Sequence, residues 1–158
     1  MQSAGNKQVL IIDDDPSILL ATELFLKEIG YSSITASNGE EGLERFYEFE
    51  PHIILLDMNM PILDGIGFLE RLPSDVFERH AFIVMTAEVD DELARQSYAF
   101  GVQSYLRKPV SKIELQALVK RNSYFHQVSE DHRQLQQRQS SILKHIPGMI
   151  FECDQDHN

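Results

Sequence analysis

The 158-residue sequence contains a single cysteine, few basic residues and no long apolar stretch. The lone Cys153 excludes an intramolecular disulfide, which favours a protein of the reducing cytoplasm. No apolar run approaches the roughly 20 residues that a membrane-spanning helix needs. The polar residues 1–8 lack the apolar region of a signal peptide. These absences predict a soluble cytoplasmic protein with no membrane partner.

Basic charge is the second shortage, because 14 Lys and Arg stand against 25 Asp and Glu, giving a formal net charge of −11. Residues 1–120 hold 10 of the basic and 20 of the acidic residues. Direct nucleic-acid binding needs a basic surface facing the phosphates, so the composition argues against it. The segment 38–42 has the wrong glycine spacing for a nucleotide-phosphate loop, and the histidines lack the spacing of metal ligands.

Apolar runs and amphipathic segments alternate along the first 120 residues. Strands are predicted at 8–12, 32–36, 53–57, 81–86 and 104–106. The first helix is predicted to begin at Asp15-Pro16, to end at Gly30 and to bury Leu19, Leu20, Leu24, Phe25 and Ile29. Further helices are predicted between Asn38 and Pro51, from Asp64-Gly65 to before Pro73, over about 90–100, and from the capping box Ser111–Glu114 onward. This alternation predicts an α/β fold, a doubly wound parallel sheet with helices on both faces.

Two of the apolar strands stop in acidic residues. The run ending at Ile12 is followed by Asp13-Asp14-Asp15, and the run 53–56 ends in Asp57. In open α/β sheets, ligands bind at the carboxyl ends of the strands. Carboxylates crowded at one sheet edge repel each other unless a cation joins them, and oxygen ligands in this number suit Mg²⁺. The pattern predicts a magnesium-assisted phosphoryl site with a carboxylate nucleophile.

The last two strands end in groups that suit a phosphoryl oxygen, the hydroxyl of Thr86 and the ammonium of Lys108. With these residues in place, residues 7–120 closely resemble the receiver domain of two-component response regulators. The matching pieces, in order, are Asp13-Asp14, Asp57, the loop Met60–Gly65, Thr86, Tyr105 and Lys108-Pro109.

The resemblance implies a flavodoxin-like strand order 2-1-3-4-5 and a phosphoryl group accepted on Asp57 from a histidine kinase, a phosphotransfer protein or a small phosphodonor. It implies Mg²⁺, with Mn²⁺ as a substitute. The implied metal ligands are Asp14, Asp57, the backbone carbonyl of Asn59 and, through water, Asp13. Val110 departs from the family, in which Phe often follows Lys-Pro.

The resemblance also assigns roles to the remaining site residues. Lys108 and Thr86 would contact the phosphoryl group, Lys108-Pro109 would be a cis peptide, and Lys108 would pair with Asp57 beforehand. Thr86 and Tyr105 would form the switch that alters the face made by the fourth helix, the fifth strand and the fifth helix. Asn59 and Glu88 would line the path of attacking water, which predicts a short-lived phosphoryl mark.

The sequence after residue 120 changes character. Residues 1–120 form the predicted receiver, and 121–146 a helical linker with a heptad seam, which is a possible parallel dimer contact. The seam positions are Phe125, Val128, His132, Leu135, Gln139, Ile142 and Ile146. Residues 142–154 resemble the opening of a PAS sensory domain, so 147–158 are interpreted as its truncated start and the chain as a piece of a longer protein.

Several functions are compatible with parts of this pattern. The favoured one is a phosphorylation switch that controls a downstream output domain or partner, with self-phosphorylation and self-dephosphorylation at Asp57 as its only chemistry. Alternatives are a docking or dimerisation module independent of phosphorylation, or the input of a hybrid kinase or cyclic-dinucleotide enzyme. A haloacid-dehalogenase-like phosphatase would need an acid where Asn59 stands. A flavin-binding module would need a Ser/Thr/Gly-rich loop in place of residues 13–15.

Overall fold

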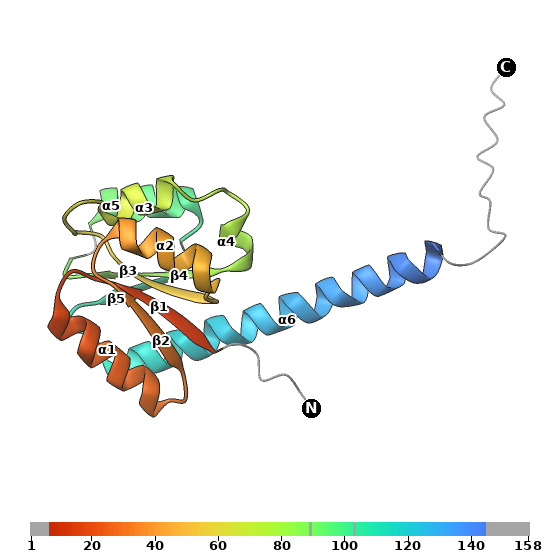
Figure 1. Ribbon diagram of the computed structural model, residues 1–158, viewed down its shortest axis with the longest axis horizontal. Helices are drawn as coiled ribbons and strands as arrows, with labels where there is room; N and C mark the ends of the chain where they lie inside the picture. Colours follow the sequence, from red (N-terminus) through yellow and green to blue (C-terminus); the bar gives the residue numbers. More distant parts are fainter. Residues whose placement is uncertain (1–6, 89, 103, 145–158) are drawn as a thin grey trace, which may run out of the picture. The chain divides into compact units, whose positions relative to one another are not determined.

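A computed structural model describes residues 7–88, 90–102 and 104–144. Five parallel strands form one sheet in the order β2-β1-β3-β4-β5 (Figure 1). The strands are β1 (Gln8–Ile12), β2 (Ser32–Ala36), β3 (Ile53–Asp57), β4 (Ala81–Thr86) and β5 (Ser104–Arg107). The helices are α1 (Pro16–Glu28), α2 (Gly39–Phe49), α3 (Gly65–Glu70), α4 (Val76–Arg79), α5 (Asp91–Phe100) and α6 (Lys112–Lys144). The predicted fold class and strand order are confirmed.

Two apolar layers hold the sheet between its helices. Alternate residues of the central strands point to opposite faces, so Val9 and Ile11 join one layer while Leu10 and Ile12 join the other. The first layer includes Leu26 of α1 and the first turns of α6, and the second includes side chains of α2, α3 and α5. Figure 1 shows the same division, with α1 and the start of α6 on one side of the sheet and α2 to α5 on the other. Because β1 and β3 are buried on both faces, their sequences are continuously apolar.

The short helix α4 was not predicted. It is a single helical turn. An ion pair between Arg79 and Asp75 at 2.8 Å stabilises it, and His80 N–H donates a hydrogen bond to the Val76 carbonyl at 2.9 Å. Val76 is its buried residue. Four residues are too few to display helical periodicity, so the sequence pattern offered no signal for this turn.

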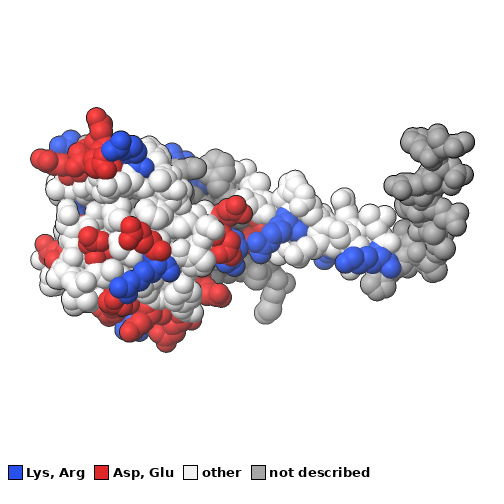
Figure 2. Space-filling model, turned by 90° about the horizontal axis from the view of Figure 1, so that it is seen from above, with Lys and Arg blue, Asp and Glu red and all other residues white. Residues whose placement is uncertain are grey.

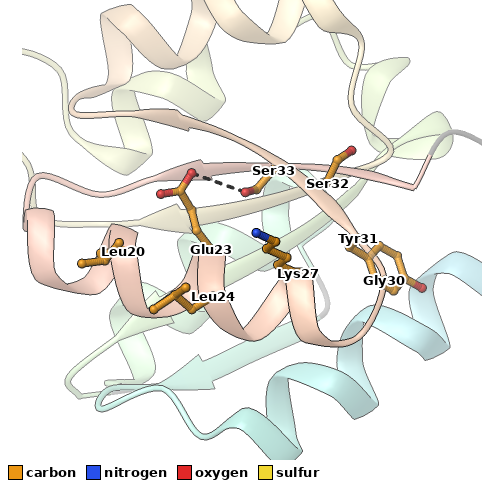
Figure 3. A pocket seen from close by; sticks show the side chains of 8 residues that line it. All are labelled: Leu20, Glu23, Leu24, Lys27, Gly30, Tyr31, Ser32 and Ser33. Carbon is orange, nitrogen blue, oxygen red and sulfur yellow. Dashed lines mark hydrogen bonds between the residues drawn. The ribbon is translucent and has the colours of Figure 1, made fainter.

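Helix α1 buries fewer leucines than the sequence predicts. Asp15 caps the helix as predicted, by accepting a hydrogen bond from Ser17 N–H at 2.8 Å. Thr22 and Leu26 are fully buried, whereas Leu20 and Leu24 are 59% and 53% exposed. The prediction for these two leucines is wrong because the buried stripe runs through Thr22 and Leu26, and Leu20 and Leu24 lie to one side of it. They line a shallow groove of about 540 Å³ between α1 and the start of β2 instead (Figure 3).

The chain divides into two compact units, residues 1–127 and 128–158, and the division falls within α6. In the second unit the described residues, 128–144, are helical, and the seam residues Val128, Leu135 and Ile142 are exposed. The side chain of Phe125 and all of Ile146 lie outside the described residues, as does the predicted PAS-like segment from residue 145 onward. No helix in the described ranges combines the length and the apolar character that a membrane span requires.

Candidate functional site

Three carboxylates meet at the carboxyl edge of the sheet. Asp57 is the last residue of β3, Asp13 directly follows β1, and Ile12 is paired with Leu56 across the two strands. One carboxylate oxygen from each of Asp13, Asp14 and Asp57 lies within 4.8 Å of the others. Asp13 and Asp57 are buried and Asp14 is exposed. The parallel arrangement therefore brings together the three acids that the sequence analysis had singled out.

The backbone fixes the direction of Asp13. Its N–H donates to the Ala36 carbonyl at 3.1 Å, and its Oδ1 accepts the Asp15 N–H at 2.9 Å. Its Oδ2 is buried and, among the described residues, accepts no hydrogen bond of good geometry. A fully buried carboxylate in this position needs a nearby positive charge.

Lys108 supplies that positive charge. Its Nζ lies 2.7 Å from Asp13 Oδ2 and 3.2 Å from Asp57 Oδ1, so the ammonium bridges both buried carboxylates and lies closer to Asp13. Its backbone N–H donates to the Thr86 carbonyl at 2.8 Å, and the predicted cis peptide to Pro109 is present. The expected partner was Asp57 alone. Sequence reasoning missed the contact with Asp13, because it depends on where the lysine chain ends between two strands.

The pKa values in this cluster shift in the directions that burial and charge demand. Burial raises the pKa of Asp57, the Asp13 charge raises it further, and Lys108 offsets only part of the increase. Burial on its own would lower the pKa of Lys108, but the carboxylates of Asp13 and then Asp57 more than offset it, so that pKa is raised. Lys108 therefore stays protonated, whereas the surroundings of Asp57 disfavour its ionised form.

Thr86 ends β4 next to this cluster. Its hydroxyl donates to the backbone carbonyl of Glu88 at 2.7 Å, and the Glu88 N–H returns a 3.3 Å hydrogen bond to the same hydroxyl. The Thr86 side chain is thereby engaged with the loop that follows its own strand. The side chain of Glu88 is exposed.

Tyr105 lies on β5 and packs against α5. Its hydroxyl donates to the Ala94 carbonyl at 3.3 Å, and its ring makes an edge contact with Tyr98 at a centroid distance of 5.6 Å. The side chain is half-buried, and burial raises the pKa of its phenol. In this conformation the ring therefore bridges β5 and α5.

The loop between β3 and α3 carries Asn59, whose backbone N–H lies 3.4 Å from Asp57 Oδ1 and whose side chain is exposed. Gly39, at the start of α2, donates its N–H to the Leu63 carbonyl of this loop at 3.0 Å. The sequence analysis interpreted Gly39 only as the start of a helix. No local pattern links it to a loop 24 positions away.

The donor set fits a magnesium ion. Carboxylate oxygens are the hard ligands that Mg²⁺ prefers, and it commonly uses few carboxylates and keeps several waters. The three carboxylates carry more negative charge than the one ammonium among them neutralises. Burial and, after it, the charge of Asp13 raise the pKa of Asp57, and a divalent cation would relieve the part that comes from neighbouring negative charge.

Comparisons with known proteins agree with this geometry. Residues 9–120 match the family model of the response regulator receiver domain. The "Probable chemotaxis protein CheY" of Rhizobium etli is 33% identical over 121 residues, which cover 75% of this chain and 94% of that protein. The alkaline phosphatase synthesis transcriptional regulatory protein PhoP of Bacillus subtilis is 34% identical over 115 residues, or 73% of this chain.

The chain spans about half the length of such transcriptional regulators, with 48% of PhoP covered. Among solved structures, a CheY-like response regulator receiver domain protein from Methanospirillum hungatei matches with a TM-score of 0.72 and 26% sequence identity. That match covers 77% of this chain and 97% of the other. The chain belongs to the response regulator receiver domain family of two-component systems.

Proposed function

We propose that this receiver accepts a phosphoryl group on Asp57. The observation that carries the proposal is the cluster at the sheet edge, where Asp57 lies beside two further carboxylates and within 3.2 Å of the Lys108 ammonium. This combines a nucleophile, a set of oxygen ligands for a divalent cation and a fixed positive charge. Phosphoryl transfer depends on such positioning and charge stabilisation more than on covalent chemistry by the protein.

The reaction forms one bond and breaks one bond. A carboxylate oxygen of Asp57 attacks the phosphorus. On the opposite side the bond from phosphorus to the donor breaks, which is a P–N bond in a phosphohistidine and a P–O bond to the acetate oxygen in acetyl phosphate. The product is an acyl phosphate on Asp57. Lys108 neutralises charge on the transferred group, and Thr86, once released from the Glu88 carbonyl, donates its hydroxyl to a phosphoryl oxygen.

Asp14, Asp57 and the backbone carbonyl of Asn59 would hold Mg²⁺, or Mn²⁺ in its place, and Asp13 would act through water. The burial of Asp13 and its pairing with Lys108 support an indirect role, whereas the exposure of Asp14 leaves it open to a hydrated ion. When bound, the cation would neutralise charge as the anionic nucleophile and the phosphoryl group approach each other.

Thr86 and Tyr105 form the proposed switch. Reorientation of the Thr86 hydroxyl toward the phosphoryl group would free space for the Tyr105 ring to turn inward, which would break its hydrogen bond to Ala94 on α5. The face made by α5, β5 and α6 would change shape, which gives an output partner something to recognise.

Intact mass measured after incubation with acetyl phosphate and Mg²⁺ tests the proposal. A gain of ~80 Da, expected for one phosphoryl group, should require the metal and should vanish in Asp57→Asn. Folded protein that binds Mg²⁺ and gains no mass would point instead to a docking module independent of phosphorylation. The same measurement followed after donor removal gives the lifetime, which we expect to be short because Asn59 and Glu88 both expose polar side chains near the site.

We further propose that the phosphoryl donor is a histidine kinase or a phosphotransfer protein of the cytoplasm, and that the output is a separate domain or partner. Nucleic acid is not among the proposed partners. On the face seen in Figure 2, acidic side chains form several clusters on the globular part, with no continuous basic surface. The overall net charge of −11 supports the same view.

The second half of α6 is the proposed contact of a parallel dimer. Its exposed apolar residues Val128, Leu135 and Ile142 alternate with the polar His132 and Gln139 at heptad spacing. A parallel arrangement matches each polar layer with itself, whereas an antiparallel one would bury the polar residues against leucine and valine.

Light scattering on the full chain tests this contact. Leu135→Lys should shift the mass toward that of a monomer, whereas Ser140→Lys, on the outer side of the helix, should not. A dimer that survives Leu135→Lys would exclude the seam.

The resemblance of residues 142–154 to the opening of a PAS domain supports an output that follows this helix.

A further inference from the structure

The loop that follows the phosphoacceptor, residues 58–64, adopts a conformation that it cannot hold by itself. At its tip, Leu63 N–H donates to the Pro61 carbonyl at 2.9 Å across Ile62, whose φ is +73°. A β-branched residue at positive φ is strained, and such tight three-residue turns are rare. Ile62 is also 79% exposed, so burial of its own side chain offers little compensation. Contacts from outside the tip must therefore stabilise this turn.

The base of the loop is one such contact. Gly65 donates its N–H to the Met58 carbonyl at 3.1 Å, so the two ends of the loop are joined. A Cβ atom at Gly65 would lie 2.7 Å from the Asp57 carbonyl oxygen and 2.6 Å from Met58 Sδ. Only glycine allows α3 to begin this close to the phosphoacceptor strand.

The other contact comes from α2, a neighbouring helix. Gly39 N–H donates to the Leu63 carbonyl at 3.0 Å, and a Cβ atom at Gly39 would lie 2.6 Å from that oxygen and 2.9 Å from Leu63 Cγ. Further along the same side chain, a Cβ atom at Gly67 of α3 would lie 2.5 Å from Leu63 Cδ1. Two glycines from two helices thus leave a slot that the Leu63 side chain fills. An ion pair also joins Glu40 of α2 to Arg71, the residue that caps the C-terminus of α3.

We propose that Gly39 and Leu63 are positioning residues of the metal and phosphoryl site. Neither residue touches the reacting atoms. The Gly39 N–H and the glycine-lined slot fix Leu63, and Leu63 fixes the strained loop that carries Asn59, which is a proposed ligand of Mg²⁺. The inference rests on the proposed function, because it assigns these residues to that site. Its consequence is that Mg²⁺ affinity depends on one backbone contact with α2.

Glycine-to-alanine variants separate this role from ordinary packing. In Gly39→Ala the added methyl group meets a backbone carbonyl, so the loop itself must move, although alanine favours the helical conformation of α2. We expect Mg²⁺ affinity to fall about tenfold, the lower end of what loss of an outer-shell partner typically causes. In Gly67→Ala the methyl group mainly meets the flexible end of the Leu63 side chain, with Asp64 Oδ1 next at 3.2 Å, and it meets no backbone carbonyl, so the loss of Mg²⁺ affinity should be smaller. Gly30→Ala is the control for losing a glycine without a clash, because a Cβ atom added at Gly30 has nothing within 4 Å, although the φ of +88° there strains an alanine.

The experiment is calorimetric titration of the full chain with Mg²⁺, with chemical unfolding in EDTA as a separate readout of stability. We expect Gly39→Ala to lose more Mg²⁺ affinity than Gly67→Ala. Gly30→Ala should bind Mg²⁺ like the wild type even if its stability falls. Leu63→Ala should weaken Mg²⁺ binding as well. If Gly39→Ala does not fold, Leu63→Ala is the variant that tests whether this contact positions the loop.

Wild-type Mg²⁺ affinity in Gly39→Ala, or in Leu63→Ala where that variant decides, would overturn the inference. So would an equal loss in Gly30→Ala, or the absence of Mg²⁺ binding by the wild type. The phosphoryl mass gain of the wild type is scored separately. A wild type that binds Mg²⁺ without gaining mass would remove the proposed function, and the order of Mg²⁺ affinities would still decide whether Gly39 positions the loop.

Discussion

Replacing Lys108 with methionine removes the only cation that the structure shows within salt-bridge distance of Asp13 and Asp57, among the described residues. Methionine retains much of the apolar stem, so the substitution mainly deletes the charge. Lys108 is 16% exposed and Asp13 is fully buried, so water cannot replace the ammonium freely. We therefore expect the variant to be less stable than the wild type in the absence of divalent metal.

The geometry of the two ion pairs bounds how much stability Lys108→Met should lose. Two ion pairs at 2.7 and 3.2 Å each attract by about 5–6 kcal/mol at an effective dielectric constant of about 20, before desolvation of the lysine is subtracted. Removing one partner of a buried ion pair typically costs about 3–5 kcal/mol. We expect the lower end, about 3 kcal/mol, because Asp57 already has a raised pKa and can take up a proton once Lys108 is gone.

Urea unfolding followed by far-UV circular dichroism measures this loss, at a fixed protein concentration because a dimer would make stability concentration-dependent. Lys112→Met is the matched control. The Lys112 ammonium pairs with Glu28, but both side chains are about half exposed, at 46% and 56%, so its removal should cost no more than about 1 kcal/mol. Millimolar Mg²⁺ should restore much of the stability of Lys108→Met and little of that of Lys112→Met. Equal losses in EDTA for the two variants would refute the idea that Lys108 compensates buried charge.

Two further predictions concern stability away from the site. Leu26→Ala should destabilise the protein by about 2–5 kcal/mol because it leaves a cavity in the core, whereas Leu24→Ala should change stability by less than about 0.5 kcal/mol; equal losses in urea unfolding would restore the original sequence prediction for Leu24. Burial lowers the pKa of His80, whose ring contacts the Pro51 carbonyl, so the unfolded chain binds a proton before the folded one does as pH falls. Stability should therefore decline as the pH falls below about 6.5, the ordinary pKa of histidine, and His80→Gln should reduce that slope; identical pH profiles would contradict the assignment.

The arrangement of the site was predictable because it follows from topology. Asp13, Asp57 and Thr86 each stand where an apolar run ends, and parallel strands place such ends at one edge of the sheet. Pairing of β1 with β3 and of β3 with β4 then makes these residues neighbours. The sequence alone could predict that these residues meet at one edge of the sheet, because this prediction needs no side-chain geometry.

Details that depend on competition for space were not predictable in the same way. Helix α1 offers more leucines at helical spacing than the sheet can cover, and the sequence does not say which of them remain outside. The preference of Lys108 for Asp13 over Asp57 rests on a difference between 2.7 and 3.2 Å. The slot for Leu63 joins glycines from two helices, so it exists only after the chain has folded.

Charge balance explains why such a site would select a divalent cation. If Asp13, Asp14 and Asp57 are all ionised, Lys108 is the one cation among the described residues that pairs with any of them, so two negative charges remain uncompensated. A divalent ion balances these two charges, and a monovalent ion does not. A phosphoryl group on Asp57 brings a charge of about −1.5 to −2, so it exceeds the carboxylate that it replaces. We expect Lys108 to respond by moving from Asp13 toward the phosphoryl oxygens, because the greater charge lies there. The pairing with Asp13 is then the resting position of a cation that the phosphorylated state draws away, and Asp13→Asn should leave Lys108 closer to Asp57 before any phosphoryl group arrives.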